Sequence, residues 1–304
     1  MAQRIASLLP SVTEIACALG LGDRLVARSH ECDYPPQVEN LPAVTAGRLP
    51  PDAVTQAQVD QAVTEAAASG EALYEVDGAL LASLAPDLVL TQSLCDVCAV
   101  DEDLVRRAVR HMDPPPPLVS LAPGRLDEVI ASVGDVAHAA GVPEAGDRLI
   151  AQLAARLDAV RARVAGRTPV RVAAVEWLDP PWSAGHWVPD QVAAAGGEEV
   201  LIAPGARSAR MTWDQVAAAR PDVVVLMPCG LSLAQVMDLA GEVPPLPARV
   251  AAVDASGLFS RPGPRLVDGV EVLEAILHPQ PGDAPPGDAW AWVDQPSGYT
   301  RKGR

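Results

Sequence analysis

The sequence predicts an α/β fold of two lobes with parallel sheets, bridged by one long helix. Short apolar runs rich in Val, Ile and Leu alternate with amphipathic stretches, which is the pattern of strand–helix–strand units with right-handed crossovers. The alternation stops after residue 125, where only helical periodicity remains, and it resumes after Gly166. We therefore expect an N-terminal α/β lobe over 1–124, a helical bridge over 125–166, a C-terminal α/β lobe over 167–278 and a Pro/Gly-rich tail over 279–304.

The N-terminal lobe begins with a predicted strand at 4–9 and a helix at 11–20. Ser11 or Thr13 can cap this helix, and Gly20 can end it. The elements that follow are a strand at 25–29, a helix around 55–68, a strand at 87–92, a helix at 101–112 and a strand at 117–121. The strand at 87–92 does not alternate polar and apolar residues, which predicts a sheet covered on both faces.

Two helices fill the bridge and are divided at Gly141-Val142-Pro143. The second, from Glu144 to Val164, is long and carries apolar residues at helical spacing. In the C-terminal lobe we expect strands at 170–177, 222–228 and 249–255, and helices near 188–195, 211–221, 232–240 and 266–277. The tail is rich in Pro, Gly and Asp, and we expect it to wrap loosely.

Composition excludes several partners. Of the 304 residues 49% are hydrophobic, so the chain can bury a sizeable core. A net charge of −16 argues against nucleic acid and anionic membranes, because both need a cationic face. No run approaches the ~18 apolar residues of a membrane span.

The N-terminus and the cysteines indicate a location. The first residues lack the basic start and the long apolar stretch of a secretory signal, and the number and spacing of the five cysteines are not typical of a secreted disulfide framework. We therefore expect a cytoplasmic protein, or a periplasmic or extracellular one if a signal has been removed.

Chemically unusual residues follow the predicted strands. Ligands of open parallel sheets bind beyond the carboxyl ends of the strands, and if the two lobes face each other these loops line one cleft. The stretches are LPSVTE (9–14), SHECDYP (29–35), TQSLCDVC (91–98), EWLDPPWSAGHW (176–187), MPCGLS (227–232) and DASGLFSRPGPR (254–265).

Aromatic residues are scarce, with six Trp, three Tyr and one Phe, and several lie in or next to the loops of the second lobe. They suit a large, flat or partly apolar ligand. The aromatic candidates for ligand contact are Trp182, Trp187, Trp213 and Phe259. His30 and His186 are either ligands of a metal centre or hydrogen-bond donors, the ordinary alternative being a solvated loop histidine.

Acidic and basic loop residues offer polar contacts. Glu31, Asp33 and Glu176 could bind cations or amide groups, although surface solvation or capping would also account for them. Arg261 could reach an anionic group of a ligand or form a salt bridge on this acidic surface.

The cysteines allow a second kind of site. Cys95 and Cys98 form a C-x-x-C, which is typical of a redox pair or half a zinc site but also arises by coincidence. Because Cys32 and Cys229 also follow strands, four thiols could together hold zinc or an iron–sulfur cluster. If Cys32 instead turns into the lobe, His30 and Tyr34 are the residues that meet the ligand.

Several of these stretches together resemble a known family. RIASLLPSVTEIACALGLGDRLVARSHECDYP closely resembles the opening of the cobalamin-binding branch of the class III periplasmic-binding-protein family, the substrate-binding subunits of cobalamin and iron–siderophore ABC importers. EWLDPPWSAGHWVPD, RPDVVVLMPCG and GLFSRPGPRLVDGVEVL resemble later landmarks of the same branch. The resemblance covers roughly residues 4–278. It implies two α/β lobes joined by a rigid helix, with the ligand held between them.

The resemblance favours a binding protein over an enzyme, and no nucleotide-binding or hydrolase motif is present. It implies cobalamin or a related corrinoid as ligand, the loop aromatics as its contacts, and His30 or His186 as the axial contact. An ABC transporter permease would be the partner if the chain is exported. The alternative is a cytoplasmic metalloprotein or enzyme whose Cys32, Cys95, Cys98 and Cys229 hold zinc or an iron–sulfur cluster.

Overall fold

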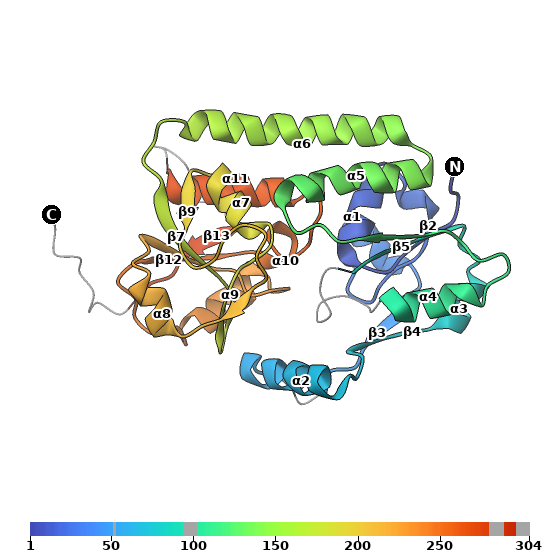
Figure 1. The fold of residues 1–304 in the computed structure, drawn as a ribbon, viewed down its shortest axis with the longest axis horizontal. Helices are drawn as coiled ribbons and strands as arrows, with labels where there is room; N and C mark the ends of the chain where they lie inside the picture. Colours follow the sequence, from blue (N-terminus) through green and yellow to red (C-terminus); the bar gives the residue numbers. More distant parts are fainter. Residues whose placement is uncertain (51–52, 94–101, 280–288, 296–304) are drawn as a thin grey trace. The chain divides into compact units, whose positions relative to one another are not determined.

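The computed structural model describes residues 1–50, 53–93, 102–279 and 289–295 (Figure 1). The chain forms two compact units. Unit 1 comprises Met1–Pro123 and Asp127–Leu153, and unit 2 comprises Gly124–Leu126 and Ala154–Arg304. Each unit contains a sheet with parallel strands and covering helices, so the predicted α/β class is confirmed. No helix in the described part of the chain has both the length and the apolar character that a membrane span needs.

Unit 1 is built on a four-stranded parallel sheet in the order β2-β1-β5-β6. Its strands are β1 (Ile5–Ser7), β2 (Leu25–Ala27), β5 (Leu88–Gln92) and β6 (Leu118–Leu121). Every residue of β5 is buried, as its unbroken apolar run predicts. Because the four strands are parallel, their carboxyl ends meet at one edge of the sheet.

The helices of unit 1 are α1 (Pro10–Ala18), α2 (Gln56–Ser69), α3 (Gly78–Ser83), α4 (Glu102–Arg110) and α5 (Leu126–Ala140). Leu81 of α3 and Val105 of α4 pack with Ala6 and Val89 of the strands, so these two helices close one face. α2 begins at a capping box formed by Thr55 and ends at Gly70, whose φ of 72° is left-handed.

Two further strands of unit 1 were not predicted. β3 (Thr45–Gly47) and β4 (Tyr74–Val76) pair antiparallel and form a ribbon outside the main sheet. Each has only three residues. A run this short shows no periodicity that separates a strand from a loop.

α6 (Pro143–Val164) is the predicted long helix, and it belongs to unit 1 as far as Leu153 and to unit 2 beyond it. Within unit 2, arginines of its second half pair with acids on α11 (Leu266–Leu277). The pairs join Arg156 to Asp268 and Glu271, and Arg163 to Glu274. Since these groups are partly exposed, each pair contributes little stability but orients the helix against α11.

Unit 2 contains a seven-stranded sheet in the order β10-β8-β7-β11-β12-β13, with β9 also paired to β7. The strands are β7 (Val170–Leu178), β8 (Pro181–Ser183), β9 (Gly197–Glu199), β10 (Ala209–Arg210), β11 (Val223–Leu226), β12 (Arg249–Val253) and β13 (Trp290–Trp292). Pairing is parallel among β9, β7, β11 and β12. The outer pairings of β8, β10 and β13 are antiparallel, so the sheet is mixed rather than wholly parallel.

The helices of unit 2 are α7 (Val188–Ala194), α8 (Trp213–Ala218), α9 (Leu233–Ala240), α10 (Ala255–Leu258) and α11. Val216 of α8 and Val236 of α9 pack in one cluster with Val224 and Leu226 of β11, which covers one face of the sheet. α7 packs against α11.

Part of the expected loose tail is a strand. β13 pairs with β12, and the Trp290 ring is buried with 7% of its surface exposed. The guanidinium of Arg249 lies 3.5 Å from the ring centroid of Trp292. The alternation Trp-Ala-Trp is the pattern in the sequence that indicates this strand. The Pro and Gly residues around it are typical of a loop, and they led to the expectation of a loose tail.

A buried carboxyl in unit 2 has an unusual pKa. Glu199, at the end of β9, accepts hydrogen bonds from the backbone N–H groups of Ala174 at 3.0 Å and Leu201 at 2.8 Å. Burial disfavours the charged carboxylate more strongly than these donors favour it, and it raises the pKa of Glu199 to about 8.

The stability of unit 2 should therefore fall as the pH rises from about 4.5 to about 8. In this window the native protein binds more protons than the unfolded chain, so raising the pH favours unfolding. The steepest slope expected for one proton is about 1.4 kcal/mol per pH unit. Urea unfolding across the window measures it. Glu199→Gln should lack this slope, whereas Glu198→Gln, the exposed neighbour, should retain it; equal slopes in all three proteins would contradict the assignment.

Candidate ligand-binding site

The loop after β2 places a polar cluster at the carboxyl edge of the unit 1 sheet. Ser29 and Thr45 are buried, while His30 is exposed. The backbone N–H of His30 lies 3.0 Å from Thr45 Oγ1, and its ring Nδ1 lies 2.8 Å from the same oxygen. The Thr45 hydroxyl in turn donates to Ser29 Oγ at 3.1 Å. The imidazole is therefore held from one side by buried hydroxyl groups.

Tyr74 extends this cluster from β4. Its ring centroid lies 5.8 Å from that of His30, with the planes tilted by 48°. Its hydroxyl donates to Glu31 Oε1 at 3.4 Å. The β3–β4 ribbon thus supplies Thr45 and Tyr74, and it makes one connected group with the predicted residues His30 and Glu31.

The remaining predicted residues of this loop lie at the surface. Asp33 is exposed, and Tyr34 has 44% of its surface exposed. Both directly follow Cys32, and Tyr34 precedes a short 3₁₀ turn at Pro36–Asn40. Their side chains are accessible to a ligand at this edge.

Cys32 turns into the lobe. Only 2% of its surface is exposed, and its Sγ lies 3.0 Å from Thr13 Oγ1 of α1. The same hydroxyl lies 3.0 Å from the carbonyl oxygen of Leu9 and 2.6 Å from Ser7 Oγ, so Cys32 Sγ belongs to a buried hydrogen-bonded group inside the lobe. The geometry assigns Cys32 a structural hydrogen bond.

The other cysteines do not complete a metal group in the described structure. Cys95 and Cys98 lie outside the described residues. Cys229 lies in unit 2 after β11, where its backbone N–H donates to the carbonyl of Glu176 at 2.9 Å. Among the residues that the structure describes, no group of three or more His, Cys, Asp or Glu side chains could hold a metal ion.

In unit 2 three predicted residues lie at or just after the end of β7: Glu176 on β7, Trp182 on β8 and His186 in the loop after β8. β8 returns antiparallel to β7 and pairs Trp182 with Trp177, and all three predicted side chains are partly exposed. His186 has a left-handed backbone with a φ of 55°, which a residue other than glycine adopts at a cost. Its N–H donates to the Ala206 carbonyl at 2.7 Å and its carbonyl accepts from Gly205 N–H at 2.9 Å, which holds the turn.

The His186 ring has a lowered pKa. Its burial disfavours the imidazolium, and the Arg207 cation nearby lowers the pKa further. The neutral imidazole is thus favoured, in which one ring nitrogen can accept a hydrogen bond or coordinate a metal ion. A strained backbone at an accessible histidine is typical of functional positions.

Three predicted aromatic residues have structural contacts. Trp187 and Phe259 are buried with 6% and 2% of their surfaces exposed, and Trp187 Nε1 donates to the Phe259 carbonyl at 2.8 Å. Trp213 begins α8 after the capping residue Thr212 and packs on the core cluster of unit 2. Arg261 is partly exposed in the loop that follows Phe259.

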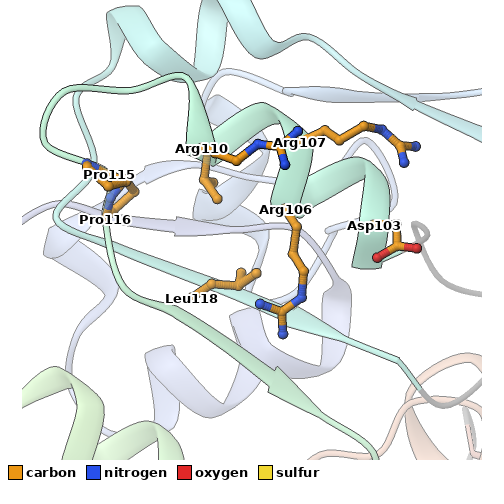
Figure 2. A pocket seen from close by; sticks show the side chains of 8 residues that line it. Asp103, Arg106, Arg107, Arg110, Pro115, Pro116 and Leu118 are labelled. Atoms are coloured by element: carbon orange, nitrogen blue, oxygen red, sulfur yellow. The ribbon is translucent and has the colours of Figure 1, made fainter.

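A hollow in unit 1 lies apart from these loops. Figure 2 shows it beside α4 and the chain that leads into β6. It is lined by Asp103, Arg106, Arg107, Val109, Arg110, Pro115, Pro116 and Leu118. These lining residues include none of the predicted ligand contacts, and we assign the hollow no part in the ligand site.

The sequence from residue 5 to residue 239 matches the family described as "Periplasmic binding protein". The chain belongs to this family. The match includes every element from β1 to most of α9, and therefore the whole unit 1 sheet, the unit 2 strands as far as β11, and the loops of the candidate site up to Cys229. The predicted family resemblance is confirmed.

Curated relatives of this periplasmic binding protein include two vitamin B12-binding proteins. That of Vibrio cholerae serotype O1 is 25% identical over 236 residues, which cover 73% of this chain and 70% of the relative. The vitamin B12-binding protein of Yersinia pestis (strain Pestoides F) is 26% identical over 237 residues, which cover 74% of this chain and 69% of the relative.

Solved structures show the same fold. The periplasmic vitamin B12 binding protein of Vibrio cholerae superposes with a TM-score of 0.64 at 22% identity, over 90% of this chain and 96% of the other. A periplasmic heme-binding protein from Roseiflexus sp. RS-1 superposes with a TM-score of 0.67 at 25% identity, over 90% of this chain and 97% of the other. Each of these two structures therefore shares its fold with 90% of this chain.

Sequence reasoning missed Thr45, Tyr74 and Arg207 as neighbours of the predicted histidines. Thr45 and Tyr74 lie on the three-residue strands β3 and β4, which carry no clear pattern. Arg207 comes from the chain between β9 and β10. Their proximity to His30 and His186 follows from tertiary contacts that one sequence does not display.

Proposed function

We propose that this periplasmic binding protein takes a cobalamin-type corrinoid as its ligand. The exposed imidazole of His30, with Glu31 and Tyr74 beside it at the carboxyl edge of the sheet, carries the proposal. A corrinoid has a metal ion at its centre and amide groups around its rim, which an imidazole and carboxylates can bind. The vitamin B12-binding relatives, aligned over about three quarters of this chain, support the same ligand.

Each unit supplies its own contacts in this proposal. In unit 1 they are His30, Glu31, Asp33 and Tyr34, and in unit 2 they are Glu176, Trp182, His186 and Arg261. The carboxylates accept hydrogen bonds from rim amides, and the Trp182 ring offers a flat apolar surface. Because Trp187 and Phe259 are buried, they support the loop from beneath, and Trp213 packs against the core.

A haem is the second candidate ligand. The heme-binding protein from Roseiflexus covers 90% of this chain at 25% identity. A haem also has an axial position that an imidazole can occupy. A zinc ion or an iron–sulfur cluster is not proposed, because Cys32 is buried against Thr13 and no group of three or more His, Cys, Asp or Glu side chains among the described residues could hold a metal ion.

The proposed partner is the permease of an ABC importer, which receives the ligand from its binding protein. The solved relatives are described as periplasmic, and this favours a periplasmic place of action over the cytoplasmic one expected from the sequence.

Calorimetric titration with cyanocobalamin, dicyanocobinamide and hemin tests the ligand. We expect a corrinoid to bind with a Kd of about 1 micromolar or below, and hemin to bind at least about tenfold more weakly. Glu31→Gln and Asp33→Asn should weaken corrinoid binding, whereas Asp23→Asn, on the turn before β2, should leave it unchanged. Tighter binding of hemin would select the second candidate. No heat with either corrinoid at about 100 micromolar would overturn the proposal.

A further inference from the structure

The hydrogen bonds of Thr45 determine which nitrogen of His30 carries the proton. A hydroxyl group has one hydrogen to donate and can accept two hydrogen bonds. The Thr45 hydrogen is donated to Ser29 Oγ, so its oxygen is an acceptor toward His30. It accepts from the His30 backbone N–H at 3.0 Å, and the contact with Nδ1 at 2.8 Å must then be an Nδ1–H donation. In the neutral ring, Nε2 consequently carries an unshared electron pair.

The surroundings of Nε2 leave that electron pair accessible. His30 is an exposed residue, and no hydrogen bond reaches Nε2 from the residues that the structure describes. A Cβ placed on Gly47 would lie 3.4 Å from Nε2, so any side chain there would begin to cover it. Glycine at this position of β3 keeps the nitrogen open. The ring is held through Nδ1 and against Tyr74, while Nε2 is free to bind.

We infer that His30 Nε2 coordinates the cobalt ion of the bound corrinoid as an axial ligand. The inference rests on the proposed function and goes further, because it specifies a corrinoid whose own nucleotide base does not occupy that axial position. Metal-binding histidines ordinarily have this arrangement, in which one nitrogen ligates and the other donates to an oxygen that fixes the tautomer. Thr45 is then a positioning residue that holds the ring.

The coordination step involves no electron transfer. The Nε2 electron pair forms the cobalt–nitrogen bond, and the bond from cobalt to water or to the nucleotide base is broken. The displaced water or neutral base leaves with its own electron pair. When the neutral ring coordinates, the proton on Nδ1 stays in its hydrogen bond to Thr45.

His186 is the less suitable of the two histidines. It is partly covered, whereas His30 is exposed. The Arg207 cation lies near its ring, which opposes a second positive centre. The hydrogen bonds of His186 to described residues hold its backbone turn, and none of them fixes Nδ1 or Nε2 in one tautomer. The Thr45–Ser29 pair provides that control only at His30.

Electron paramagnetic resonance of bound cob(II)inamide tests the coordination. This corrinoid has no nucleotide base, so a nitrogen splitting of its cobalt lines must come from the protein. We expect a three-line splitting with the wild-type protein, which becomes two-line when the histidines carry ¹⁵N. His30→Ala should lose the splitting and bind cob(II)inamide on the order of tenfold more weakly. Adding free imidazole to this variant should restore the three-line pattern. His111→Gln, a histidine outside the site, should retain it.

Variants of Thr45 test the positioning role separately. Thr45→Val removes both hydrogen bonds to His30 with little change of volume, and we expect an affinity for cob(II)inamide about tenfold lower. Thr45→Ser keeps the hydroxyl and should return the affinity and the splitting toward wild type. In the ligand-free protein, ¹⁵N resonances of His30 should show an unprotonated Nε2, and Thr45→Val should mix the two tautomers. Circular dichroism confirms that each variant is folded.

The outcomes separate the two proposals. Absence of binding by any corrinoid overturns the proposed function. Two other results overturn only the assignment to His30 and leave the corrinoid as ligand. One is corrinoid binding without a nitrogen splitting. The other is a splitting that survives His30→Ala and disappears in His186→Asn. Asparagine is chosen at residue 186 because it tolerates the left-handed backbone. A protonated Nε2 in the ligand-free protein also contradicts the inference.

Discussion

Gly269→Ala is expected to lower the free energy of unfolding of unit 2 by about 3 kcal/mol. The added methyl group would lie 2.2 Å from the carbonyl oxygen of Leu258 and 2.8 Å from Gln191 Nε2. The carbonyl belongs to the backbone of α10 and cannot swing aside, so α10 and α11 would have to separate. Gln191 Nε2 donates to the carbonyls of Leu258 at 3.0 Å and Leu266 at 2.8 Å, and separation breaks these buried bonds as well.

Urea unfolding followed by tryptophan fluorescence measures this loss. Trp187 Nε1 donates a hydrogen bond to the carbonyl of Phe259, the residue after Leu258. Trp187 emission should therefore also report a shift of the chain at Leu258 and Phe259. Gly241→Ala is the matched control, because Gly241 has a φ of −65° and an added Cβ would meet no atom within 4 Å. We expect it to change the free energy of unfolding by less than about 0.5 kcal/mol. Equal stabilities of the two variants would contradict the close approach at Gly269.

Gly185→Ala is expected to weaken both unit 2 and its ligand loop. Its methyl group would lie 2.5 Å from the Ala206 carbonyl oxygen and 2.6 Å from the Ser208 backbone nitrogen. To relieve this clash, the segment Ala206–Ser208 has to move away from Gly185. That movement breaks the hydrogen bond from the His186 N–H to the Ala206 carbonyl. We expect a loss of about 2 kcal/mol in the free energy of unfolding and a corrinoid affinity about tenfold lower.

Parallel unfolding and calorimetric measurements separate the two effects of Gly185→Ala. Gly22→Ala serves as the control, because the nearest atom to its added Cβ is Cys17 Sγ at an ordinary 3.7 Å. That variant should match the wild type in both measurements. If Gly185→Ala loses stability but binds corrinoid normally, the loop that carries His186 has no part in binding.

The elements with long apolar runs were predictable because burial on both faces of a sheet leaves a direct mark on composition. β5, β11 and β12 lie within the predicted strands, β7 ends one residue beyond its prediction, and α6 begins one residue before its prediction. β3, β4, β8, β9, β10 and β13 were missed, because strands of two or three residues carry too little periodicity and their pairing is decided by distant partners. The antiparallel edges of the unit 2 sheet arise in the same way.

Residue identity placed His30, Glu31, Cys32 and Tyr34 after a strand, at the edge where ligands of parallel sheets bind. It did not determine which way each side chain points. Cys32 turns inward, where its buried Sγ lies 3.0 Å from Thr13 Oγ1, so it does not face the ligand edge. Trp187 and Phe259 are likewise buried, although their loop positions resembled those of exposed contacts.

Apolar patterning was enough to establish two α/β units, a long connecting helix and the loops that carry the candidate site, because each depends on the local sequence. Which ring nitrogen of neutral His30 carries the proton depends on Thr45, fifteen residues away, and on Ser29 behind it. Such a network forms only when β3 lies beside the loop after β2. Folding therefore converts an ordinary loop histidine into an oriented imidazole with an open Nε2.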